Sequence, residues 1–146
     1  MSKQEEAGLI LKLYELRREE TLRTARDWYF REFNPQTIQD FTAAMMGPHS
    51  GHVRMVVTYW DMAATLVLQG AISMEMFAET NGEQIGVFMK IKKLLPEIRQ
   101  QFGPRFAVNL EKLIEQMPHG KEQVAAMRER MKMILAALKA QAQAAN

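Results

Sequence analysis

The chain has 146 residues, a formal net charge of +2 and no cysteine. This length suffices for one domain whose core needs no disulfide or metal for stability. The absence of cysteine excludes thiol catalysis, cysteine-ligated zinc and disulfide bonds, and it favours a reducing compartment. Basic residues are interspersed with acidic ones along the chain, so the concentrated basic face typical of nucleic-acid binding is not expected.

The N-terminal segment has neither the apolar centre nor the small-residue cleavage site of a signal peptide. The most apolar stretch of the chain contains Arg54 and Asp61, so it is interrupted before it reaches the length of a membrane span. We therefore expect a cytoplasmic protein with no membrane-spanning segment.

The first thirty-three or so residues have helical texture, but their apolar positions do not stay on one face. Three leucines between residues 9 and 16 share one face, and the apolar residues from 22 to 33 share another. Either the helix breaks near Glu20, or its two halves contact different neighbours. In the second case, residues 1–18 project from the domain and pack on a second copy.

The stretch 52–69 is predicted to be the central helix. It follows a helix over 35–46 that begins at Pro35, and Gly70 ends it as a left-handed cap. Its polar residues recur at spacings of three and four and form one narrow stripe, while every other face is apolar. A helix of this kind is covered on several sides by its neighbours, so the others should pack around it.

The second half of the chain is divided into helices by capping residues and by breaks at glycine and proline. A short helix over 74–80 precedes a longer one that Pro96 should kink. An amphipathic helix follows over 106–117. The last helix runs from about 121 to 142, and the end of the chain, 140–146, is expected to fray. No segment alternates like a strand, so the whole chain is predicted to form an all-α, single-domain bundle of six or seven helices.

Asp61 is the first candidate site, because a carboxylate on an apolar helix needs a partner if it is buried. Arg99 should point towards the core from the kinked helix, so we favour a structural Asp61–Arg99 ion pair that holds two helices in register. The alternative is a polar pocket for a small molecule along the stripe of the central helix. Its candidate lining residues are Arg54, Thr58, Asp61, Thr65 and Arg99.

Other clusters have structural explanations. His49 and His52 lack a third ligand, so no metal site is expected. No phosphate loop, nucleophile elbow or other catalytic frame is present, so we expect neither a catalytic residue nor a cofactor. Nucleic-acid binding through the arginines of 17–26 is less favoured than a solvated helix face that pairs with Glu20 and Asp27. These arginines are Arg17, Arg18, Arg23 and Arg26.

The triplet YWD at 59–61, the turn GAIS at 70–73 and the segment LPEIR at 95–99 occur in this order. In this order they resemble a widespread family of small bacterial helical proteins recorded as a domain of unknown function, over roughly 37–116. The resemblance implies a bacterial protein and supports the Asp61–Arg99 pairing, but it implies no activity. Some members carry an N-terminal membrane segment, and none is expected here.

The sequence therefore favours a non-catalytic helical module for protein–protein interaction or self-association, expected as a homodimer. A helix whose apolar stripe exceeds what one domain can cover recruits a partner. The expected interface residues are Leu9, Leu13 and Leu16, together with Met133 of the last helix. The alternative function is a small-molecule sensor or enzyme with a pocket along the polar stripe.

Overall fold

A computed structural model of the protein describes residues 2–146. Every regular element in this part of the chain is helical, which confirms the prediction of an all-α, single-domain bundle. The helices are α1 (Lys3–Arg18), α2 (Glu20–Arg31), α3 (Ile38–Met46), α4 (Ser50–Leu68), α5 (Met74–Thr80), α6 (Glu83–Ile91), the 3₁₀ helix η1 (Lys92–Leu94), α7 (Leu95–Phe102), α8 (Val108–Gln116) and α9 (Gly120–Ala144).

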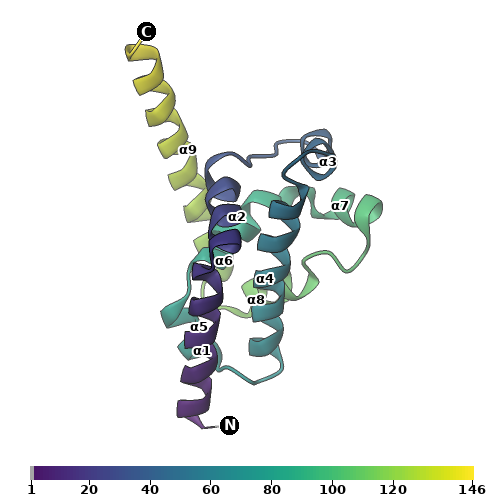
Figure 1. Cartoon of the computed structure of the whole chain (residues 1–146), viewed down its shortest axis with the longest axis vertical. Helices are drawn as coiled ribbons and strands as arrows, with labels where there is room; N and C mark the ends of the chain where they lie inside the picture. Colours follow the sequence, from purple (N-terminus) through teal and green to yellow (C-terminus); the bar gives the residue numbers. More distant parts are fainter. Residues whose placement is uncertain (1) are drawn as a thin grey trace.

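Helix α4 is the central helix, as the sequence predicts (Figure 1). It contacts α2, α3, α6 and α8, which cover it on several sides. Trp60 lies in its middle and is fully buried, and the small residues Ala63 and Ala64 allow neighbouring helices to approach closely. Gly70 follows with φ +83°, the left-handed conformation expected of the cap.

Helices α1 and α2 are separate, which confirms a break near Glu20. Glu19 has an extended backbone, and its carboxylate accepts hydrogen bonds from the N–H groups of Thr21 (3.0 Å) and Leu22 (3.1 Å). These bonds cap α2 and lower the pKa of Glu19. Ile10 and Leu13 are buried, so α1 packs on the domain and does not project from it.

The segment after α5 contains more elements than predicted. Helix α6 ends at Ile91, η1 follows, and Pro96 lies in the first turn of α7, where its missing N–H costs nothing. Proline therefore begins a new helix here and does not kink a longer one. Together with the break at Glu19, this division raises the number of helices above the six or seven expected.

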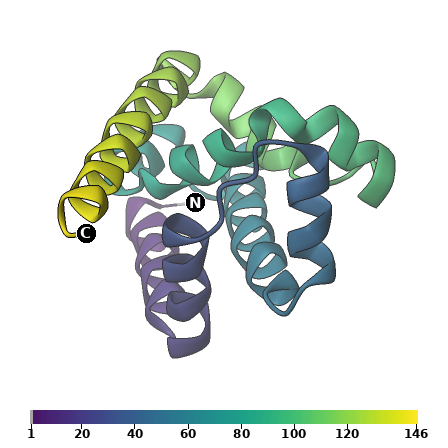
Figure 2. The same ribbon diagram turned by 90° about the horizontal axis from the view of Figure 1, so that it is seen from above.

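Helix α9 has two different halves. Its first half packs on α6 and α8, with Val124 buried. From Lys132 onward every residue is exposed, and the helix projects beyond the rest of the molecule (Figures 1 and 2). The helix also continues to Ala144, where the sequence had suggested a frayed tail.

Candidate functional site

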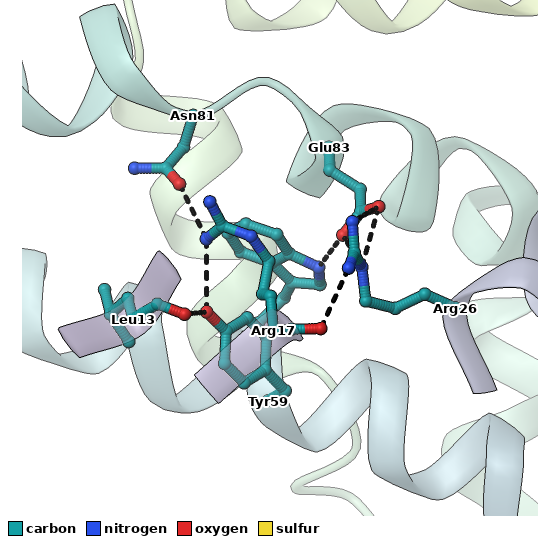
Figure 3. Close-up of polar contacts among 7 residues, drawn as sticks. Leu13, Arg17, Arg26, Tyr59, Asn81 and Glu83 are labelled. Carbon is teal, nitrogen blue, oxygen red and sulfur yellow. Dashed lines mark hydrogen bonds and ion pairs between the residues drawn. The ribbon is translucent and has the colours of Figure 1, made fainter. Parts of the chain in front are cut away.

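A network of polar side chains joins α1, α4 and the link between α5 and α6 (Figure 3). Arg17 donates through Nη1 to Tyr59 Oη (3.1 Å) and to Asn81 Oδ1 (2.9 Å). Tyr59 in turn donates to the carbonyl oxygen of Leu13 (2.6 Å), and the Arg17 guanidinium lies 5.1 Å from the ring centre of Trp60. This arrangement fixes the C-terminal turn of α1 against α4.

A second part of the network is built on the ion pair between Arg26 and Glu83. Arg26 binds both carboxylate oxygens of Glu83, with Nε and Nη2 each at 2.9 Å from their nearest oxygens. Glu83 also accepts from Trp60 Nε1 (3.0 Å), and Arg26 Nη1 donates to the carbonyl oxygen of Arg17 (3.0 Å) at the end of α1. The pair thereby holds α1, α2, α4 and α6 in one geometry (Figure 3).

The network is suited to holding the fold and offers no free base or nucleophile. Burial raises the pKa of Tyr59, so its hydroxyl remains protonated and acts as a donor. Both oxygens of Glu83 and the main donors of Arg26 are already bound to protein groups. The network is therefore structural.

No pattern in the sequence predicts this network. Arg17 and Arg26 were expected on a solvated face that pairs with Glu20 and Asp27, and that prediction is wrong for these two residues. Their partners lie 64 and 57 residues away, whereas Asp27 pairs locally with Arg31 at 2.8 Å. A signal was present, because Arg17 is four residues after the buried Leu13 and shares its helix face.

The predicted Asp61–Arg99 ion pair is wrong, because each residue has a different partner. Asp61 accepts from the N–H of Leu110 (2.9 Å) and from Asn109 Nδ2 (3.2 Å) at the start of α8. Arg99 binds Glu111 (2.9 Å) and donates to the carbonyl oxygen of Phe106 (3.0 Å). Asp61 and Arg99 therefore both contact α8, and they do not contact each other.

Asp61 has this role because α8 begins without a cap of its own. Ala107 precedes the helix with φ +54°, and its methyl side chain cannot accept a hydrogen bond. Leu110 is the third residue of α8, and its N–H is one of those that an N-cap side chain normally binds. The carboxylate from α4 takes the place of that side chain, and its negative charge is favoured at a helix N-terminus.

The remaining residues of the polar stripe do not form the predicted pocket. Arg54 is exposed, and its guanidinium donates to Ser50 Oγ at 3.3 Å. Thr58 and Thr65 donate to the carbonyl oxygens four residues before them, at 2.6 and 3.0 Å. The hydrogen bonds of these two hydroxyls are therefore made within α4. The side chains of the stripe and Arg99 do not line one common cavity.

A different, largely apolar groove lies between the α1–α2 junction and α4, with a volume of about 530 Å³. We call it the α1–α4 groove. Half-exposed Leu16 and Met62 contribute to it, and Glu19 is the one charged residue in its lining. The lining consists of Leu16, Glu19, Leu22, Met55, Thr58, Tyr59 and Met62.

The four residues expected at an interface have different surroundings. Leu13 is buried, and Leu9 packs against the core, so these two stabilise the domain itself. Leu16 is exposed at the α1–α4 groove, and Met133 is 71% exposed on α9. An apolar stripe that includes Ile134, Leu135 and Leu138 is also exposed on the projecting half of α9.

His49 and His52 lie beside Trp28, and the ring of His49 stacks on its indole with centroids 4.8 Å apart. Within residues 2–146 no three histidine or acidic side chains are grouped as metal ligands. The same part of the chain contains no helix with the length and hydropathy needed to cross a bilayer.

The family model described as a domain of unknown function (DUF4760) matches residues 4–117. The chain belongs to the DUF4760 family. This confirms the resemblance seen in the sequence and extends it to α1 and α2. The DUF4760 match ends before α9, so the projecting helix lies outside the matched residues. Searches of curated proteins and of solved structures gave no match to this DUF4760 chain.

Proposed function

We propose that this DUF4760 protein is a non-catalytic helical module that forms a homodimer through α9. The observation that carries the proposal is the apolar stripe on the projecting half of this helix. Ile134, Leu135 and Leu138 are 53%, 40% and 56% exposed, and they continue the face on which Val124 is buried. Covering such a stripe removes apolar surface from water, which favours association.

The α1–α4 groove of a second copy is the proposed partner of this stripe. The groove supplies apolar side chains, including two methionines that adapt their shape to a bound helix. Its charged residue is Glu19, whereas the projecting half of α9 carries Lys132 and Lys139. The stripe and the groove are therefore complementary in both polarity and charge.

The arrangement points to contact between copies, because α9 of the same chain leads away from the body of the domain (Figure 1). If each copy inserts its α9 into the groove of the other, the two contacts are equivalent and the dimer closes around a twofold axis. Leu16 then belongs to the interface, as expected from the sequence. The cytoplasmic setting expected from the cysteine-free composition is part of the same proposal.

The proposal is tested by the mass of the protein in solution. We expect light scattering to give twice the chain mass for the native protein and the chain mass for the double variant Ile134→Ser, Leu138→Ser. Met133, which the sequence places at the interface, lies on the opposite side of α9 from the stripe and is left out of the proposed interface. Met133→Ser is therefore the matched control, on the same part of α9. The control should remain dimeric.

A groove variant tests the second half of the interface. Met62→Lys places a positive charge in the groove that should accept the basic helix, so it is expected to give a monomer. A dimer that persists in this variant would refute the groove as the docking site. A native protein with the chain mass at every concentration would refute self-association altogether.

A further inference from the structure

A pocket of about 580 Å³ lies in the angle between α9 and the body of the domain. Its walls come from the link between α2 and α3, from α6 and η1, and from the turns of α9 where that helix leaves the body. The volume is within the range of small-molecule sites. We call it the α9 pocket.

Four cationic side chains line the α9 pocket, and its lining contains no acidic residue. These residues are Lys90, Lys93, Arg128 and Lys132. Lys132 has a carboxylate partner in Glu129, at 3.3 Å, but both side chains of that pair are well exposed and interact weakly. The positive charge of the pocket is therefore not balanced by the residues that line it.

Two of the cations, Lys90 and Lys93, donate to neutral groups of the protein. Lys90 is buried, and its ammonium donates to the carbonyl oxygens of Tyr29 (2.9 Å), Phe30 (3.2 Å) and Phe33 (2.5 Å) at the end of α2. Lys93 donates to Gln36 Oε1 at 3.2 Å. Arg128 is half-buried, and its guanidinium has no hydrogen-bond partner within residues 2–146. The flat guanidinium fork of Arg128 is thus available for a carboxylate or phosphate group.

Apolar side chains also line the α9 pocket. Met89, Met131 and Leu135 line the pocket beside the cations, and the two methionines can adjust to the shape of an apolar ligand. The smaller pocket beside Arg23 and Arg26 lacks this combination, because Glu83 and Asp27 are part of its lining.

We propose that the α9 pocket binds an organic anion with an apolar body. The anionic group would lie against Arg128, Lys93 and Lys132, and the apolar body against Met89, Met131 and Leu135. A carboxylate or phosphate joined to an alkyl chain has this chemistry, whether it is a free metabolite or part of a lipid. The pocket shares Lys132 and Leu135 with the helix surface of the proposed dimer, whereas Ile134 and Leu138 do not line it. The double variant Ile134→Ser, Leu138→Ser therefore tests the dimer without changing the lining of the pocket.

The first test is a fluorescence titration with 8-anilinonaphthalene-1-sulfonate, which combines a sulfonate with an apolar ring system. We expect saturable binding that decanoate displaces, while decanol and inorganic phosphate at the same concentrations do not. Decanol lacks the charge and phosphate lacks the apolar body, so the three competitors separate the two requirements. Equal displacement by decanol and decanoate would overturn the role of the cations.

Variants assign the binding to this pocket. The double variant Arg128→Ala, Lys132→Ala should weaken decanoate competition by about tenfold or more, since it removes two charged contacts. Arg130→Ala is the matched control, because Arg130 has the same charge on the other flank of α9 and does not line the pocket. Circular dichroism should show that all variants keep native helix content. If the double variant and the control bind equally, the proposal is wrong.

Vesicles distinguish the two sources of the ligand. Co-sedimentation with phosphatidylglycerol vesicles that is absent with phosphatidylcholine vesicles, and is lost in the double variant, would identify a lipid. Decanoate binding without co-sedimentation would identify a free amphiphilic anion. Absence of both binding to the fluorescent probe and co-sedimentation would overturn the proposal.

Discussion

Asp61 stabilises a helix to which it does not belong, and this gives the first prediction at the scale of single residues. Replacing Asp61 with alanine leaves the N–H of Leu110 without its acceptor at the start of α8. Losses of N-cap side chains cost about 1 kcal/mol, so we expect a decrease of this size in the free energy of unfolding, measured with urea.

The control for Asp61 is Arg54→Ala, which removes an exposed charge from the same polar stripe. A surface change of this kind should alter stability by less than about 0.5 kcal/mol. Equal effects of the two substitutions would contradict the capping role of Asp61.

Lys90 gives a prediction about pH. Burial lowers its pKa from 10.5 to about 8, so above pH 8 the folded protein loses this proton while the unfolded chain keeps it. Since the unfolded state then binds more protons, the contribution of Lys90 to stability should rise between about pH 8 and 10.5. Below pH 8 both states hold the proton, and the contribution is constant.

The measurement compares the native protein with Lys90→Met at several pH values. Other titrating groups affect both proteins alike, so the difference in unfolding free energy isolates Lys90. We expect this difference to shift in favour of the native protein as the pH is raised from 7 to about 9.5. A difference that does not change with pH would show that burial does not disfavour the charged form.

The same residues show what sequence reasoning can reach at this scale. It correctly indicates that Asp61 needs a partner, because a carboxylate on an apolar helix is costly when unpaired. It cannot identify the partner. The N–H of Leu110 needs an acceptor because Ala107, which precedes α8 in a left-handed conformation, has no side chain that can cap the helix, and no local sequence signal marks that conformation. Arg26 and Glu83 likewise meet only after α2, α4 and α6 have packed together.

At the scale of elements, helix ends that a glycine or a capping side chain marks were predicted well, and ends without such a residue were missed. Gly70 and Ser73 have the roles that their residue types predict, and the central helix was placed within two residues at its N-terminal end. The division of 83–102 was missed because η1 has the sequence KKL, which contains no glycine or capping residue to mark a helix end, and lysine and leucine are both good helix formers. Only the tertiary packing of α6 and α7 on different neighbours reveals it.

Gly120 permits the close contact between the start of α9 and the end of α8. An added Cβ at this position would lie 1.9 Å from the carbonyl oxygen of Ile114, which is backbone and cannot move aside easily. We therefore expect Gly120→Ala to lower the free energy of unfolding by about 1–3 kcal/mol, the usual cost of overpacking. Thermal unfolding followed by circular dichroism measures the loss.

Gly8 provides the matched control for Gly120. It also lies in a helix, but an added Cβ would meet no atom within 4 Å. Alanine favours helices over glycine by up to about 1 kcal/mol, so Gly8→Ala should leave the protein equally stable or make it more stable. A similar loss in both variants would refute the steric explanation.

At the scale of the whole molecule, the chain consists of a packed body and one projecting helix. The family match covers 4–117, and the buried core lies almost entirely within those residues, with Val124 of α9 added to it. Composition and periodicity were sufficient to predict an all-α body around 52–69. They could not show which apolar helix end would project, because the stripe of α9 has the same spacing in its buried and its exposed half.

This division predicts different results for two truncations. Removal of 132–146 takes away no buried residue and should abolish the proposed dimer, so its melting temperature should differ by less than about 2 °C from that of the monomeric variant Ile134→Ser, Leu138→Ser. Removal of 119–146 also uncovers the face of α6 on which α9 packs, together with the contacts of Val124 and Gly120. The second truncation should therefore melt several degrees lower. Equal melting temperatures for the two truncated proteins would mean that α9 contributes nothing to the body, and its direction away from the domain would then not be fixed by packing.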